Sequence, residues 1–445
     1  MSNIKKSPRF LAMELLVKIR KQKTYSNIGL NQFIRKNDLN NADASLLTNL
    51  VYGVLQYRLT LEFYLKPFIK KARKIDPWVY ELLLLAIYQM EYLDRIPIHA
   101  IFNETIEIAK IKGHAGTRKF VTGILHNIKR QGLPNFDHLS DEQYLSIKNS
   151  VPIWIVKQLI NSVGLEKTNK ILQSVNQKPN ESLRVNVVKN SKNDLQVELK
   201  EEDIETTDSK VAKDGLVAQS GFLAGTQAFK NGKFIIQDES AMLVEESMNV
   251  APGEIILDAC SAPGGKTTQI AAALKNSGKV VALDIHEHKL KLVEQNALRL
   301  GVNSVIETQK LDARKVSNEF PDNYFDQILV DAPCSGIGLI RRKPEIRYDK
   351  TLKDSLNLAK IQLSILDSVA DKLKVGGKLT YSTCTILPTE NQTVVDSFLK
   401  SHSNFVQIKT KTAKAIKDSR EDLGLTIYPD DFNSDGFFIA TLVKK

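Results

Sequence analysis

Two cysteines, Cys334 in DAPCSG and Cys384 in YSTCT, are the residues of this chain best suited to covalent chemistry. Each follows a short apolar run of the kind that forms a buried strand. A free cysteine is most often a small buried hydrophobe, but two thiols at one edge of a sheet favour a reactive site. A thiolate is intrinsically very nucleophilic, although a thiol with a pKa of about 8.5 is ionised to only a few per cent at neutral pH.

Such a pair of thiols suits a substitution at carbon 5 of a cytosine ring. That carbon is too weak a nucleophile to attack a methyl donor unaided, whereas a thiolate added to carbon 6 turns the ring into an enamine that can do so. A base must then remove the proton from carbon 5 so that the thiol can leave. Cys384, Cys334 and Asp331 are the candidates for the nucleophile, the base and the acid near ring nitrogen 3.

A glycine-rich turn, LDACSAPGGKT (residues 257–267), follows a predicted buried strand. Gly264 and Gly265 allow the backbone to approach a ligand closely. A phosphate-binding P-loop would need glycine in place of Cys260, and the dinucleotide pattern G-x-G-x-x-G is absent. Asp284, twenty residues after Gly264, ends the next predicted strand, where an acid binds ribose hydroxyls. The pattern favours a nucleoside ligand without a pyrophosphate; the alternative is a tight turn plus a surface acid.

Four aspartates share one structural position, the end of a predicted strand. They are Asp258, Asp284, Asp312 and Asp331. Isolated acids at such positions would be costly without partners. Each alone could be a loop cap, but together they predict a polar pocket of nucleoside size.

A basic run, GIGLIRRKPEIRYDK, lies between the two thiols in sequence. Its cations are Arg341, Arg342, Lys343, Arg347 and Lys350. They are candidates for gripping the phosphates of a substrate strand. The alternative is an ordinary basic loop on a neutral domain.

Net charge is strongly segregated along the chain. Of a total of +11, residues 1–135 hold 22 Lys and Arg against 10 Asp and Glu, whereas the other 310 residues hold 40 against 41. A segregated basic excess is typical of nucleic-acid binding. The alternative is a well-solvated helical surface.

The remaining composition excludes several classes of protein. Three cysteines make no disulfide framework, no C-x-x-C pair is present, and the seven histidines are scattered, so we expect no metal. Neither a cleavable leader nor an apolar run of about 18 residues is present, so we expect a soluble cytoplasmic protein without membrane contact. Nothing demands more than a monomer, and 445 residues indicate two or three domains.

Three regions follow from the periodicity. Residues 1–135 carry apolar residues at helical spacing throughout. Residues 136–235 predict linker helices and then a small α+β module, in which SLRVNVV, LQVEL, GLVAQ and KFIIQ have the period of strands. Residues 236–445 alternate strands with helices, which predicts a parallel, doubly wound sheet with its ligands at the carboxyl ends of the strands.

The chain carries four distinctive motifs: QDESA (237–241), LDACSAPGGKT, DAPCSGIGLIRRKPEIR and YSTCTILPTEN (381–391). They resemble those of the RNA 5-methylcytosine methyltransferase family, in particular the Sun-type (Fmu, RsmB) enzymes of bacterial small-subunit ribosomal RNA. The stretches ADASLLTNLVYGVLQ and RIPIHAIFNETIEIAK are similar to the all-helical NusB fold. The resemblance covers essentially the whole chain. It implies a multidomain protein: an all-α NusB-like RNA-binding domain, a small α+β module, and an α/β Rossmann-like class I methyltransferase domain.

The resemblance also implies S-adenosylmethionine as cofactor and 16S ribosomal RNA as partner. It assigns the nucleophile to Cys384, and to Cys334 a part in product release. Asp284 would hold the ribose, Asp312 would lie near the adenine, and Asp331 would face the reactive end. The cofactor loop would comprise Cys260, Ser261, Ala262, Pro263, Gly264, Gly265 and Lys266.

Gln56-Tyr57 and His126-Asn127 stand where relatives often carry arginines, which weakens an RNA contact at those points.

Three other functions compete with this interpretation. DNA cytosine methyltransferases use a P-C cysteine as nucleophile, which would exchange the roles of Cys334 and Cys384; an N-methyltransferase fits less well, because Cys334 replaces the aromatic residue expected after D-P-P. An RNA-binding or antitermination factor could retain a methyltransferase scaffold without activity. The intact glycine loop, the acids and both cysteines argue against that loss. Which cytosine is modified, and whether naked RNA or a particle is the substrate, stay open.

Overall fold

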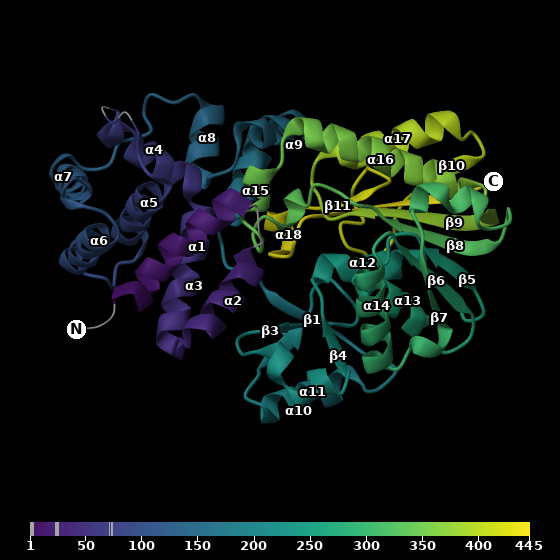
Figure 1. Cartoon of the computed structure of the whole chain (residues 1–445). Helices are drawn as coiled ribbons and strands as arrows, with labels where there is room; N and C mark the ends of the chain where they lie inside the picture. The colour runs from purple at the N-terminus through teal and green to yellow at the C-terminus, as the bar shows by residue number, and fades with distance from the viewer. Residues whose placement is uncertain (1–3, 23–25, 71, 73) are drawn as a thin grey trace. The chain divides into compact units, whose positions relative to one another are not determined.

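The computed structural model describes residues 4–22, 26–70, 72 and 74–445 (Figure 1). The chain forms two compact units. One contains Met1–Asn176 together with Ile340–Asp349, and the other contains Gln177–Leu339 together with Lys350–Lys445. The chain therefore leaves the second unit shortly after Cys334, contributes ten residues to the first unit, and returns.

The first unit is helical, as its apolar spacing predicts. Its helices are α1 (Pro8–Gln22), α2 (Ser26–Asn37), α3 (Asn41–Gln56), α4 (Arg58–Ile69), α5 (Pro77–Tyr92), α6 (Ile98–Lys112), α7 (Ala115–Gln131), α8 (Asp141–Asn149), α9 (Ile153–Ser174) and the short α15 (Ile346–Asp349). Helix α5 lies at the centre of its core, since every residue from Leu82 to Ile87 is buried. Proline at the first position of α5 is tolerated because its missing N–H has no partner there anyway.

Helix α9 has a break at Gly164, whose φ of 76° and ψ of 169° are not helical. Helix α9 thus consists of two shorter helical segments, in the region for which linker helices are predicted. Helix α8 begins at Asp141, in the region for which linker helices are predicted, because Ser140 and Gln143 form a reciprocal cap at its start.

The second unit begins with a small antiparallel sheet in the order β2-β3-β1-β4. Its strands are β1 (Glu181–Val185), β2 (Thr206–Asp208), β3 (Gly215–Ala218) and β4 (Phe234–Ile236), and its helices are α10 (Lys192–Glu201) and α11 (Gln227–Lys230). The strand predicted for LQVEL is wrong, because these residues lie in α10. Leu195 and Leu199, four residues apart, share a buried helical face while Val197 is exposed; the alternation imitated a strand.

An eight-stranded sheet forms the rest of this unit, in the order β10-β12-β9-β8-β5-β6-β7 with β11 beside β12. Its strands are β5 (Ile255–Asp258), β6 (Lys279–Asp284), β7 (Ile306–Lys310), β8 (Phe325–Asp331), β9 (Leu373–Thr383), β10 (Phe405–Ile408), β11 (Leu425–Ile427) and β12 (Phe437–Lys444). The sheet is parallel from β9 to β7, as predicted. The C-terminal strand β12 instead runs antiparallel to β9, β10 and β11, so the sheet is mixed.

Helices cover both faces of this sheet (Figure 1). On one face pack α16 (Leu352–Ala370) and α17 (Gln392–Ser401), and on the other pack α12 (Glu239–Met248), α13 (Gly265–Ala273) and α14 (Glu287–Leu300). The short α18 (Pro429–Phe432) precedes β12. This three-layer arrangement brings the carboxyl ends of β5, β6, β8 and β9 to one edge, where the predicted site residues lie.

No helix among the described residues is long and apolar enough to cross a membrane.

Candidate active site at the carboxyl edge of the large sheet

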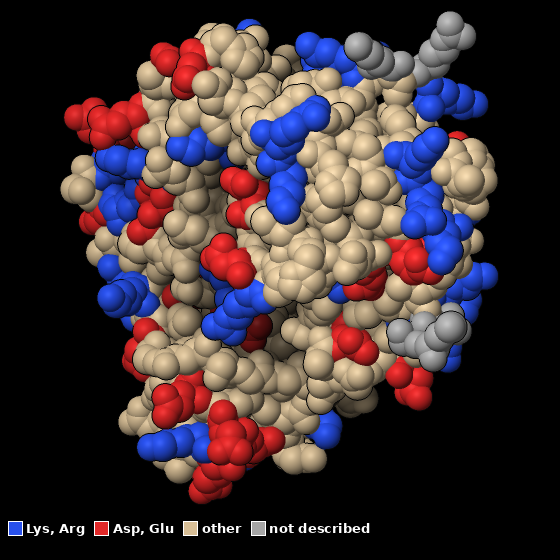
Figure 2. Space-filling view, turned by 90° about the vertical axis from the view of Figure 1, so that its left-hand side faces the viewer, with Lys and Arg blue, Asp and Glu red and all other residues tan. Residues whose placement is uncertain are grey.

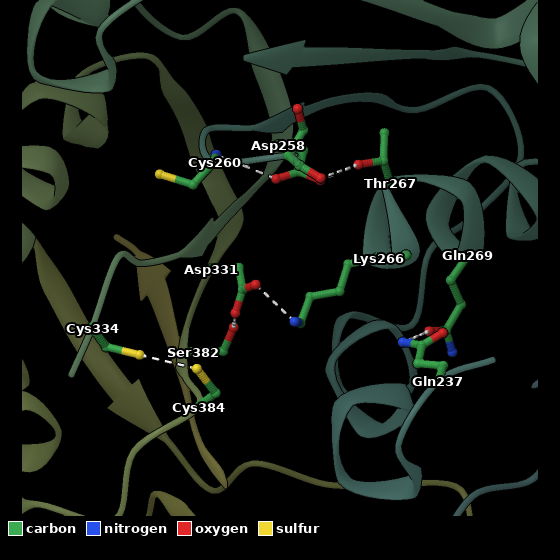
Figure 3. A network of polar contacts seen from close by, with 12 residues as sticks. Gln237, Asp258, Cys260, Lys266, Thr267, Gln269, Asp331, Cys334, Ser382 and Cys384 are labelled. Carbon is green, nitrogen blue, oxygen red and sulfur yellow. Dashed lines mark hydrogen bonds and ion pairs between the residues drawn. The ribbon is translucent and has the colours of Figure 1, made fainter. Parts of the chain in front are cut away.

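The two predicted thiols lie together. Cys334 follows β8 and Cys384 follows β9, and the two strands are parallel neighbours, so both residues leave the sheet at the same edge. The sulfur atoms are 3.2 Å apart and share a hydrogen bond, with the side chains turned toward each other (Figure 3). This hydrogen bond, together with burial, raises the pKa of the Cys334 thiol. One thiol is thus held in its protonated form beside the other.

The loop that carries Cys334 is fixed by a buried carboxylate, Glu390. One carboxylate oxygen accepts hydrogen bonds from the Ser335 amide at 2.7 Å and from the Gln362 side chain at 3.2 Å. The other accepts from the Ser355 hydroxyl at 2.7 Å. The Gly338 amide adds a 3.0 Å bond to the Cys384 carbonyl. Both thiols therefore sit on backbone that is tied to the same buried network.

Asp331, at the end of β8, lies beside the thiols and is oriented by two partners. The Ser382 hydroxyl donates to Oδ1 at 2.8 Å, and the Lys266 ammonium donates to Oδ2 at 2.7 Å (Figure 3). Burial lowers the pKa of Lys266, but the Asp331 carboxylate more than offsets this, and the net shift is upward. The arrangement joins the glycine loop to the strand that leads to Cys334.

Asp258 supports the glycine loop from within. Its side chain is fully buried, accepting from the Thr267 hydroxyl at 2.7 Å and from the Cys260 amide at 3.4 Å. Burial raises the pKa of Asp258 to about 7. Asp258 thus holds the two ends of the loop together.

The loop itself approaches its neighbours closely. The Ser261 amide donates to the Leu283 carbonyl at 2.8 Å, which ties the loop to β6. Gly264 begins α13 with a φ of 100°, and a Cβ there would lie 3.0 Å from the Cα of Val293. Glycine at 264 is therefore required both by the backbone conformation and by the close contact with α14.

The aspartates at the ends of β6 and β7 differ in their surroundings. Asp284 is partly exposed, and its Oδ1 accepts from the His286 amide at 2.8 Å, while Oδ2 has no hydrogen-bond partner among the described residues. Asp312 caps the next turn and pairs with Arg314 at 2.6 Å. Asp284 therefore has an oxygen available for a ribose hydroxyl, and with the glycine turn it fits a nucleoside cofactor.

Two of the five cations in the basic run between the thiols are not available to the phosphates of a substrate. Arg341 and Arg347 are buried, and Arg347 has no exposed surface. The Arg347 guanidinium donates to the carbonyls of Ser150 and Ile340 at 3.1 and 3.0 Å and to Oδ1 of Asn176 at 3.0 Å, all within the helical unit. Burial lowers the pKa of Arg347. The phosphate-contact interpretation is wrong for these two residues, because both side chains are buried.

Three structurally important residues were missed from the sequence. They are Glu390, Ser382 and Arg184. Arg184, fully buried in β1, donates to the Gly265 carbonyl at 2.7 Å and to the Thr268 hydroxyl at 3.1 Å. Its burial lowers its pKa to about 10. A charged residue inside the apolar run SLRVNVV was the available signal, since a buried cation needs specific partners.

In the part of the chain that the structure describes, no group of three or more His, Cys, Asp or Glu side chains could hold a metal ion.

A Rossmann-like sheet with a glycine turn at its edge and aspartates at its strand ends defines a class I methyltransferase domain. Three family descriptions match along the chain: the NusB family over residues 6–130, the ferredoxin-like domain of RsmF/B-like methyltransferases over 151–222, and the 16S rRNA methyltransferase RsmB/F over 246–443.

Relatives match over nearly the whole length. A probable ribosomal RNA small subunit methyltransferase B of Bacillus subtilis (strain 168) is 44% identical over 445 residues, which cover 99% of both chains. Ribosomal RNA small subunit methyltransferase B of Photorhabdus laumondii is 32% identical over 410 residues, 92% of both chains. The crystal structure of PH0851 has the same fold, with a TM-score of 0.82 at 24% identity over 98% of this chain and 99% of that one. The chain belongs to the RsmB/F family of S-adenosylmethionine-dependent ribosomal RNA methyltransferases.

Proposed function

We propose that this protein transfers a methyl group from S-adenosylmethionine to carbon 5 of a cytosine in 16S ribosomal RNA, through a transient covalent bond between the cytosine and Cys384. The observation that carries the proposal is the 3.2 Å approach of the Cys384 and Cys334 sulfurs beside the oriented carboxylate of Asp331. A nucleophile, a proton acceptor and a group for ring nitrogen 3 then face one reacting base, as addition to carbon 6 requires.

The steps can be assigned to the chain's own residues. The Cys384 thiolate adds to carbon 6 while Asp331 holds the ring at nitrogen 3, and the electron pair displaced toward carbon 5 makes that carbon nucleophilic. Bound S-adenosylmethionine supplies an electrophilic methyl group. Cys334 then accepts the proton of carbon 5; the electrons of that C–H bond restore the double bond and expel Cys384 as a thiolate. Cys334 enters this step as a thiolate, and the raised pKa of its thiol makes that thiolate a strong base for the carbon 5 proton. The proton then passes from Cys334 to solvent, since each methyl transfer releases one proton.

The cofactor site is assigned to the carboxyl edge of the sheet. The loop from Cys260 to Lys266 would surround the cofactor, Asp284 would bind its ribose, Asp312 would lie near its adenine, and Asp331 would face its reactive end. Two observations support this assignment: Asp284 has a free oxygen, and the backbone at Gly264 has a positive φ that favours glycine.

The RNA substrate is inferred from the names of the relatives, and the function of each region is inferred from the family and from the distribution of charge. The relatives are named for small-subunit ribosomal RNA, and residues 1–135 hold the basic excess. We assign RNA binding to residues 1–135, support to the helices and small sheet of residues 136–235, and catalysis to residues 236–445, in a monomeric cytoplasmic enzyme. The target base would be unstacked into the site, at a cost of a few kcal/mol that is lower in a loop.

The experiment measures methyl transfer from labelled S-adenosylmethionine to small-subunit RNA that lacks its modifications, with denaturing gels to detect protein–RNA adducts. We expect Cys384→Ala to be inactive and free of adduct, and Cys334→Ala to accumulate adduct. If Cys334→Ala instead abolishes both transfer and adduct while Cys384→Ala retains them, the nucleophile is Cys334, as in DNA cytosine methyltransferases. No transfer by the wild-type protein to RNA or to the particle would refute the proposed activity.

A further inference from the structure

Helix α7 of the helical unit has an unusually one-sided charge. Among its 17 residues are four Lys or Arg and not one Asp or Glu. Its apolar side, formed by Val121, Ile124, Leu125 and Ile128, is buried in the core, so the cations are confined to the solvent side. Elsewhere on the face shown in Figure 2, Lys and Arg side chains are interspersed with Asp and Glu. An unbroken positive face of this kind attracts a polyanion.

The cations of α7 form two pairs on the same side of the helix. Arg118 and Lys119 lie near its start, and Lys129 and Arg130 lie eleven residues later. Eleven residues are about three turns and about 16 Å along the axis, so the second pair lies almost directly in line with the first. The spacing places two positive clusters along one helix face, a distance that a nucleic-acid backbone spans with a few phosphates.

A hollow of about 880 Å³ lies at the first of these pairs, between the end of α6 and the start of α7. Lys110, His114, Arg118 and Lys119 line it, and no carboxylate does. Arg118 and Lys119 are exposed, and their side chains make no hydrogen bond or ion pair with a described residue. Both side chains are therefore available to an external anion.

Small residues keep the space between the cations open. Gly123 lies in the middle of α7, where glycine is less favourable than alanine, and a Cβ there would meet no atom within 4 Å. Packing therefore does not require glycine at this position. A partner that must approach the helix backbone between the charged pairs gives a reason for it.

We propose that the exposed face of α7, with the end of α6, binds backbone phosphates of the RNA substrate. This inference rests on the proposed function for the identity of the polyanion. RNA carries one charge per nucleotide in a regular row, which matches two in-line cationic clusters with an unobstructed helix surface between them.

The test compares two substitutions of equal charge in the full-length protein. Arg118→Gln with Lys119→Gln removes the first pair of α7. Lys353→Gln with Lys360→Gln removes two exposed lysines from α16, which lies outside the hollow and outside the residues assigned to RNA binding. Binding to unmodified small-subunit RNA is measured over a range of salt concentrations, and kcat and KM are measured for methyl transfer.

We expect the α7 variant to bind RNA about 10- to 30-fold more weakly near 0.15 M salt, and its slope of log K against log salt to fall by about 1.5, the effect of two lost phosphate contacts. KM should rise while kcat at saturating RNA is retained, and the charge-conserving Arg118→Lys with Lys119→Arg should restore binding. An unchanged slope and KM, or an equal loss in the α16 variant, would overturn the inference. Because binding is measured without turnover, a wild-type protein that binds RNA but transfers no methyl group would refute the proposed activity and leave this test valid.

Discussion

Glu390 holds the loop that carries Cys334, so its replacement should disturb the position of that loop without removing the thiol. Glu390 is fully buried and accepts three hydrogen bonds, from the Ser335 amide, the Gln362 side chain and the Ser355 hydroxyl. In Glu390→Ala the Ser335 amide loses its acceptor, and the Gln362 amide keeps only its 3.0 Å bond to the Pro333 carbonyl, so one N–H of each stays unpaired, whereas the Ser355 hydroxyl can rotate. Each unpaired donor costs about 1–3 kcal/mol, so we expect a loss of about 4 kcal/mol in the free energy of unfolding.

Glu390→Gln is the matched control. Its single amide oxygen can still accept from the Ser335 and Gln362 donors, and its amide group can donate to the Ser355 hydroxyl, which is able to act as acceptor. All three contacts survive without the charge, so we expect a loss of about 1 kcal/mol. The two variants differ in volume as well, but only the alanine variant leaves buried donors unpaired.

The assay is urea unfolding followed by gel detection of protein–RNA adducts. Because Ser335 directly follows Cys334, a loosened loop should impair the step assigned to Cys334 and leave adduct on Glu390→Ala, while Glu390→Gln should turn over. Equal losses of stability in the two variants would refute the argument from unpaired donors. Stable Glu390→Ala protein with normal release of product would refute the role of this carboxylate in placing the loop.

Further predictions concern buried and strained positions. Arg347→Met should lower the free energy of unfolding by about 3–5 kcal/mol, because three close buried acceptors lose their bond to the guanidinium. Lys353→Met, at an exposed position, should change it by less than about 0.5 kcal/mol; urea unfolding of both variants measures the difference. Gly264→Ala should lower the melting temperature more than Gly253→Ala, since both glycines have a positive φ but only a Cβ at 264 meets a neighbour. The pKa of Asp258 is raised from 3.8 to about 7, so between these pH values the folded state binds a proton that the unfolded state does not. The free energy of unfolding of the wild type, relative to that of Asp258→Asn, should therefore fall by on the order of 4 kcal/mol as pH rises from 4 to 7. A difference that does not change with pH would contradict this.

Local sequence patterns predicted most of the fold. Apolar spacing identified the helices of the first unit, and the alternation of strands and helices identified the large sheet, since both patterns record which side of an element is buried. The failures have physical causes. LQVEL is too short for a strand's alternation to be distinguished from the i, i+4 spacing of a helix. The antiparallel direction of β12 depends on the end of β9 at which the preceding loop brings the chain back to the sheet, and local spacing does not contain that information.

The site residues divide in the same way. The types and order of Cys334, Cys384, Asp331 and the glycine loop indicated a two-thiol methyl transfer before any geometry was known, because that chemistry needs those groups at adjacent strand ends. Tertiary structure decided their supports. Glu390 and Arg184 reach the site across the fold, and sequence distance says nothing about such contacts.

What the sequence by itself determined is the set of reactive groups, the elements that carry them and the segregation of positive charge into the first 135 residues, since each is a property of residue type and local period. What only the tertiary structure decided is which charges are free to act. Arg347 and Arg118 are equally basic in the sequence, yet one is buried against carbonyl oxygens and the other lies in an open hollow. Desolvation and hydrogen bonding depend on surroundings that packing alone creates, and they separate a structural cation from a binding one.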